Sequence, residues 1–159
     1  MVLLIWMHLN DVNLNYHNKK IMKRKATAVW NGTIKEGQGI ISTESGVLKS
    51  AQYSYKTRFE NGIGTNPEEL IGAAHSGCFT MQLSAYLTEE NFNPERLETT
   101  CEITFEDGTV TKSHLNLKAT VPNIEKDAFD TLVKKAKENC PISKLLKAEI
   151  TVEAVLNEE

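Results

Sequence analysis

The stretch that decides the fold spans residues 66–90 and reads NPEELIGAAHSGCFTMQLSAYLTEE. Asn66 can cap a helix, Pro67 suits the first helical turn, and Glu69 stands three residues after the cap, as in a capping box. The residues that follow are apolar or small on nearly every side, and a helix without a polar face is typically buried all round. We therefore predict a long central helix that other parts of the protein cover.

The segments on either side of this helix read mainly as strands. Short β-type stretches lie between Thr27 and Arg58, and the pair Asn31-Gly32 predicts a tight hairpin turn between two of them. Downstream, the pattern predicts a hairpin at residues 100–121 with its turn at Asp107-Gly108, a helix at 125–139, a short helix ending at 146, and a strand at 150–154. This order of sheet, buried helix, hairpin, helix and strand indicates an α+β domain.

Length and charge narrow the class of protein. The 159 residues suit one domain, and the net charge of −3 gives no attraction to nucleic acid. The apolar start of the chain is too short to span a membrane, which takes about 20 residues. We treat residues 1–21 as an N-terminal extension, with Met22 as an alternative first residue, and residues 22–159 as the domain. Three cysteines without a recognisable signal peptide favour a reducing, cytoplasmic location.

Two of the cysteines are candidates for redox chemistry. Cys78 lies within the predicted central helix, where a free cysteine most often packs as a small apolar side chain. Cys140 precedes Pro141 at the expected N-cap of the short helix, where free N–H groups and the helix dipole favour a thiolate. Cys101 faces inward from a strand, and we expect it only to pack.

Three further residues fit a site around these thiols. Arg58 carries a guanidinium that would stabilise a thiolate and a peroxide oxygen, and Glu68 would orient it through a bidentate ion pair. Arg58 is equally well explained as a solvated strand residue, and Glu68 as a carboxylate at a helix N-terminus. His75 lies one turn before Cys78; a Cys–His nucleophile pair is possible in principle, but we expect a hydrogen-bonded core histidine. The apolar run around Cys78, with Phe79 beside it, favours substrates with an alkyl part.

Other functions remain open from these residues alone. A cysteine hydrolase would use Cys78 and His75 but would leave Cys140 without a purpose. In a binding module the cysteines would be inert, and the pocket would hold an apolar ligand. A zinc site is the weakest alternative, because only Cys78, Cys140 and His75 are available and no CxxC spacing exists.

Four stretches of residues 22–157 closely resemble the OsmC (osmotically inducible protein C) branch of the OsmC/Ohr family of hydroperoxide reductases. They are ISTESGVL at 41–48, TRFE at 57–60, GTNPEELIGAAHSGCF at 64–79 and AKENCPISKLLKAEI at 136–150. The resemblance implies that Cys78 is the peroxidatic cysteine and Cys140 the resolving cysteine. It also implies that Arg58 and Glu68 are the active-site arginine and glutamate.

The resemblance further implies how the protein works. The Cys78 thiolate would reduce an organic hydroperoxide and become a sulfenic acid, which Cys140 would convert into a disulfide. An external dithiol, either a small molecule or a lipoylated protein, would restore both thiols. No metal and no organic cofactor is implied. The family forms intertwined homodimers, with antiparallel sheets around a buried central helix, and acts in defence against oxidative and osmotic stress.

Helix geometry gives a separate reason to expect a second chain. Glu68 and Cys78 are ten residues apart, which places them about 15 Å apart along a straight helix and about 80° from a shared face. Arg58 is too short to reach both residues. Either a partner subunit brings Arg58 and Glu68 to Cys78, or the helix breaks near Gly72.

Overall fold

The computed structural model describes residues 21–157, so most of the predicted N-terminal extension lies outside the described residues. The elements are β1 (Ala26–Asn31), β2 (Gln38–Thr43), β3 (Ala51–Tyr53), α1 (Tyr55–Phe59), α2 (Pro67–Glu89), β4 (Arg96–Glu106), β5 (Thr109–Thr120), α3 (Lys126–Asn139), α4 (Pro141–Leu145) and β6 (Glu149–Leu156). This order confirms the predicted α+β class. Between residues 21 and 157, no helix is long and apolar enough to cross a membrane.

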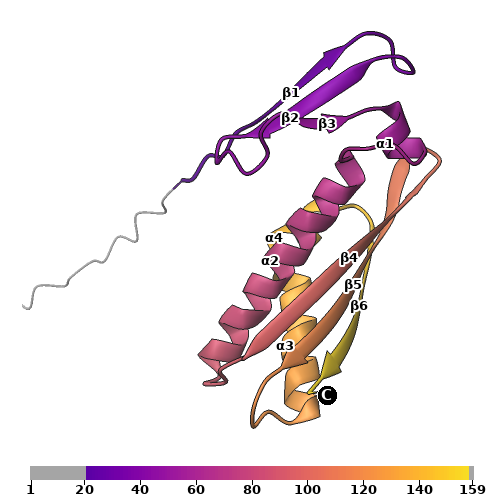
Figure 1. Cartoon of the computed structure of the whole chain (residues 1–159). Coiled ribbons are helices and arrows are strands. Elements are labelled where there is room, and N and C mark those ends of the chain that lie inside the picture. The colour runs from indigo at the N-terminus through magenta and orange to yellow at the C-terminus, as the bar shows by residue number, and fades with distance from the viewer. Residues whose placement is uncertain (1–20, 158–159) are drawn as a thin grey trace, which may run out of the picture.

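The main body packs α2 and α3 against the sheet β4-β5-β6 (Figure 1). The hairpin β4–β5 turns at Asp107 and Gly108, whose φ angles of 48° and 79° are the positive values that a two-residue hairpin turn requires. β6 pairs with β5 in parallel, so this sheet is mixed rather than wholly antiparallel as predicted. The core residues come mainly from α2, β5 and α3, and they include Phe79, Leu83, Leu115, Leu117, Phe129 and Ala136.

The first three strands form a separate antiparallel sheet beyond the N-terminal end of α2 (Figure 1). The predicted tight turn at Asn31-Gly32 is wrong: Asn31 pairs with Gln38, so residues 32–37 form a longer loop. The prediction of β-structure up to Arg58 is also wrong. Residues 55–59 form α1, which is capped by reciprocal hydrogen bonds between Ser54 and Thr57.

The start of α2 lies where the sequence predicts it. The Asn66 side chain accepts a hydrogen bond of 2.8 Å from the Glu69 backbone N–H, and Pro67 begins the first turn. The expected capping box is only half formed, because the Glu69 carboxylate accepts a hydrogen bond from Thr65 instead. The Asn66 amide also donates to the Thr57 carbonyl at 3.1 Å, which ties α1 to the start of α2.

One face of α2 is uncovered, so the prediction of a helix buried on every side is wrong for the single chain. The rest of the helix packs against β4, α3, α4 and β5. The exposed positions lie along one side of the helix and form what we call the open face of α2: Ala73, Ala74, Gly77, Met81 and Ala85. Met81 is 76% exposed, and a Cβ atom added to Gly77 would meet no atom within 4 Å. A surface this apolar normally has a partner.

Candidate active site

Two thiols that are distant in sequence meet between α2 and α4. The Sγ atoms of Cys78 and Cys140 lie 2.9 Å apart, although the residues are 62 positions apart in the chain. Cys78 lies mid-way along α2 and is partly exposed, whereas Cys140 is fully buried at the junction of α3 and α4. Both are free thiols. A small movement would therefore bring the two sulfurs to the bonding distance of about 2.0 Å.

The surroundings of Cys78 in the single chain favour the protonated thiol. Burial raises its pKa, and the hydrogen bond and charge of Cys140 raise it further. A backbone hydrogen bond from Ile142, in the first turn of α4, acts in the opposite direction and lowers the pKa of Cys78. We expected the free N–H groups of this helical turn to stabilise a thiolate at Cys140, but the Ile142 N–H bonds the Cys78 sulfur instead.

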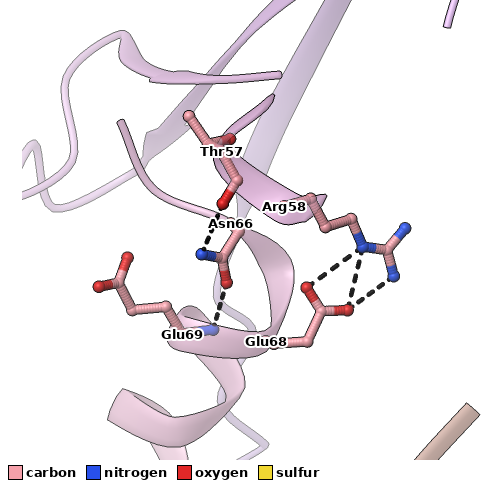
Figure 2. Close-up of polar contacts among 5 residues, drawn as sticks. All are labelled: Thr57, Arg58, Asn66, Glu68 and Glu69. Carbon is pink, nitrogen blue, oxygen red and sulfur yellow. Dashed lines mark hydrogen bonds and ion pairs between the residues drawn. The ribbon is translucent and has the colours of Figure 1, made fainter. Parts of the chain in front are cut away.

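Arg58 and Glu68 form the predicted ion pair at the N-terminal end of α2 (Figure 2). Arg58 Nη2 donates to Glu68 Oε1 at 2.6 Å, and Arg58 Nε lies 3.1 and 3.2 Å from the two carboxylate oxygens. The guanidinium also stacks over the Phe105 ring at 4.8 Å. The ion pair fixes the orientation of the guanidinium. The Arg58 side chain is still 36% exposed, so part of the cation remains accessible.

The single chain does not bring the four predicted site residues together. The cysteine pair and the Arg58–Glu68 pair each form, but they lie about ten residues, or roughly 15 Å, apart along α2. α2 is continuous from Pro67 to Glu89, so the alternative of a helix break near Gly72 is wrong.

An apolar groove of about 270 Å³ lies beside Arg58. Its walls come from β1, β3, α1 and the loop after β1, and include Trp30, Ile34, Tyr53, Tyr55 and Phe59. Phe79 is not part of this groove. It is fully buried in the core, on the inner side of α2, so it offers no exposed apolar wall next to Cys78 in the single chain.

His75 is a hydrogen-bonded core histidine, as predicted. Its Nδ1 lies 2.7 Å from Ser113 Oγ and its Nε2 lies 2.8 Å from Ser143 Oγ. Both ring nitrogens are therefore occupied by hydroxyls, which leaves neither nitrogen to activate Cys78. Neither serine was predicted as a partner of His75. Ser143 lies in the stretch 136–150 that carries the family resemblance, but nothing in that stretch relates its hydroxyl to a histidine in α2.

Cys101 packs from β4 toward the same buried cluster. Its Sγ lies 3.2 Å from Ser113 Oγ, and burial raises the pKa of this thiol. A metal site has no support among residues 21–157, where no three His, Cys, Asp or Glu side chains cluster.

Comparison with known proteins identifies the family. The model of the family described as OsmC-like protein matches residues 59–155. Peroxiredoxin OsmC of Escherichia coli (strain K12) is 47% identical over 134 residues, which cover 82% of this chain and 94% of that protein. The chain belongs to the OsmC-like family. A more distant relative, the organic hydroperoxide resistance protein-like 2 of Staphylococcus epidermidis, is 33% identical over 59% of this chain and 68% of its own length.

Solved structures show the same OsmC-like fold. An organic hydroperoxide resistance protein from Elizabethkingia anophelis superimposes with a TM-score of 0.65 at 23% identity, over 89% of this chain and 99% of that chain. An OsmC-like protein from Vibrio cholerae gives a TM-score of 0.66 at 16% identity, over 85% and 100%. These structures confirm the OsmC-like fold of the chain, whereas the intertwined homodimer stays a prediction.

Proposed function

We propose that this OsmC-like chain is a thiol-dependent peroxidase that reduces organic hydroperoxides, with Cys78 as the attacking thiol and Cys140 as the resolving thiol. The observation that carries the proposal is the 2.9 Å approach of two free thiols, one buried and one accessible. The relative from E. coli is named a peroxiredoxin, and the similarity extends over most of both chains. A binding module would need neither the thiol pair nor its geometry.

The reaction balances with these two thiols and a dithiol reductant. The Cys78 thiolate attacks the terminal oxygen of the hydroperoxide, the O–O bond breaks, and the alkoxide takes a proton and leaves as the alcohol. Cys78 is then a sulfenic acid. Cys140 attacks that sulfur, the S–O bond breaks, and water leaves as the disulfide forms. An external dithiol reduces the disulfide by exchange, which suits a reducing compartment such as the cytoplasm.

The cation that this chemistry needs comes, in our proposal, from a second copy of the chain. The pKa of Cys78 is raised in the single chain, and the roughly 15 Å of helix between Glu68 and Cys78 keeps the chain's own Arg58 away. A partner subunit packed on the open face of α2 would present its Arg58–Glu68 pair near Cys78. There the guanidinium would favour the thiolate and stabilise negative charge on the departing oxygen.

The groove beside Arg58 supports an organic rather than an inorganic peroxide. Its five aromatic or aliphatic walls suit an alkyl or aryl group, while the exposed edge of the guanidinium can hold the peroxide oxygens. Each buried methylene contributes about 0.8 kcal/mol of binding. Hydrogen peroxide offers no carbon to this groove and therefore gains none of that free energy.

Thiol titration tests the proposed function. The reduced protein has three titratable cysteines per chain, and one equivalent of cumene hydroperoxide should remove two of them. The control is the variant Cys101→Ser, which has two thiols; the same treatment should leave it with none. A binding module or a cysteine hydrolase would keep all its thiols, and that result would overturn the proposal.

A further inference from the structure

Two side-chain contacts between α2 and the segment formed by α4 and its N-cap lie three residues apart on each side. Cys78 meets Cys140 with 2.9 Å between the sulfurs, and His75 meets Ser143 at 2.8 Å. His75 stands three residues before Cys78, and Ser143 three residues after Cys140. The second contact is therefore about one helical turn from the first on both segments.

The histidine end of this contact is fixed. His75 is fully buried, and its other ring nitrogen is held by Ser113 of β5 at 2.7 Å. Ser113 in turn contacts the Cys101 sulfur of β4 at 3.2 Å. The imidazole is thus anchored to the sheet as well as to α2, and it presents Nε2 to α4 in one orientation.

The α4 end, by contrast, has few other attachments. α4 is five residues long, too short to be stable by itself, and its Leu145 is 73% exposed. Its Cys140 cap makes no side-chain capping hydrogen bond. The backbone N–H of Ile142 bonds the Cys78 sulfur, and the Ser143 hydroxyl is the α4 side chain that hydrogen-bonds α2. Cys140 itself is buried and its N–H bonds Ala136 of α3, so loss of the Ser143 hydroxyl should loosen α4 without releasing Cys140 from the core.

We propose that His75 is a positioning residue for the resolution step: through Ser143 it holds α4 so that Cys140 stays within reach of the oxidised Cys78. This inference rests on the proposed function. In the step concerned, the Cys140 sulfur bonds to the Cys78 sulfur, the S–O bond of the sulfenic acid breaks, and the oxygen leaves as water. His75 touches none of these atoms. Orientation of reacting groups is a large contribution to such intramolecular steps.

The test separates the two steps of one turnover in Ser143→Ala. This variant removes one hydroxyl from a partly exposed position, so folding should be preserved. Sulfenic acid formation with cumene hydroperoxide should stay within about 2-fold of wild type, whereas disulfide formation should slow roughly 5-fold, as expected for the loss of one partly buried hydrogen bond. Sulfinic acid at Cys78 under excess peroxide should rise accordingly, because a longer-lived sulfenic acid is exposed to a second oxidation.

Two matched variants test whether a general loss of stability could cause the slower disulfide formation. Ser113→Ala loosens the sheet's hold on the same ring but keeps the His75–Ser143 hydrogen bond, so it should slow disulfide formation less than Ser143→Ala does, although it empties a fully buried position and should cost at least as much stability. Ser143→Thr keeps a hydroxyl and should restore the rate. Unchanged disulfide formation in Ser143→Ala, or equal slowing of both steps, would overturn the inference. If the wild-type protein formed no disulfide at all, the proposed function itself would fail.

Discussion

The thiols of Cys78 and Cys140 are in contact at 2.9 Å before any oxidation has occurred. In the proposed mechanism the resolving thiol, Cys140, is therefore already in place when Cys78 reacts, and its presence also raises the pKa of Cys78. The arrangement favours rapid disulfide formation at the cost of a less reactive attacking thiol. A nearby cation would offset that cost.

Replacing Cys140 by Ala should lower the pKa of Cys78. The hydrogen bond and the charge of Cys140 both raise that pKa, and the substitution removes them while burial and the Ile142 N–H remain. The rate of iodoacetamide labelling at Cys78, followed by peptide mass against pH, should rise at lower pH than in the parent. Both the Cys140→Ala protein and its parent carry Cys101→Ser. A midpoint that is unchanged or higher would contradict this cause.

Organic hydroperoxides should be better substrates than hydrogen peroxide, and the groove beside Arg58 should be the reason. Ile34→Ala removes apolar surface from the groove at a side chain that is 66% exposed, so stability should hardly change. We expect kcat/KM for cumene hydroperoxide to fall roughly 5-fold, and that for hydrogen peroxide to stay the same. Equal losses for both peroxides, or a wild-type preference for hydrogen peroxide, would count against the groove.

The buried His75 should make folding stability depend on pH. Burial lowers the pKa of His75 below its ordinary value of 6.5, so the unfolded chain binds the proton first as the pH falls. Stability is then complete above about pH 6.5 and is lost below it, by at most about 1.4 kcal/mol per pH unit. Urea unfolding at about pH 7.5 and about pH 5.5 should show a smaller difference for His75→Gln than for wild type.

The control for this prediction is His114→Gln, which removes a histidine that is only partly buried and bonds Thr151. The difference between the two pH values is measured for this variant alongside His75→Gln. The same pH dependence in His75→Gln as in wild type would show that other groups cause it.

Subunit mixing tests the shared site. Cys78→Ser and Arg58→Ala should each be inactive alone, but a heterodimer would contain one site with Cys78 from one chain and Arg58 from the other. After subunit exchange, activity should recover to about one quarter of wild type, because about half of the dimers are mixed and each has one intact site. If exchange is demonstrated and activity stays absent, each site is built within one chain.

Local signals predicted much of the fold. Asn66 and Pro67 fixed the start of α2, and the alternation around Asp107-Gly108 fixed the β4–β5 hairpin, because caps and turns depend on a few neighbouring residues. The direction of β6 was not predictable, since alternation along a strand does not say whether its partner runs parallel. α1 was missed because five residues are too few for a helical period, and its Ser54–Thr57 cap lacks the usual Glu or Gln.

The open face of α2 shows a different limit. Positions such as Ala74, Gly77 and Met81 have the composition of a core helix, and composition does not tell whether the cover comes from the same chain or from another. The thiol pair and the Arg58–Glu68 pair were expected from family resemblance, whereas the His75–Ser143 contact needed coordinates. Nothing in the sequence relates a histidine in α2 to one serine 68 residues away.

Peroxide stoichiometry in the two cysteine variants tests the division of roles between Cys78 and Cys140 most directly. Without added dithiol, Cys140→Ser should consume about one equivalent of cumene hydroperoxide and hold a sulfenic acid that dimedone traps at Cys78. Cys78→Ser should consume none, and it should show no turnover when dithiol is supplied. If Cys78→Ser kept the first equivalent while Cys140→Ser lost it, the two roles would be reversed. If both variants turned over like wild type, neither thiol would be the site.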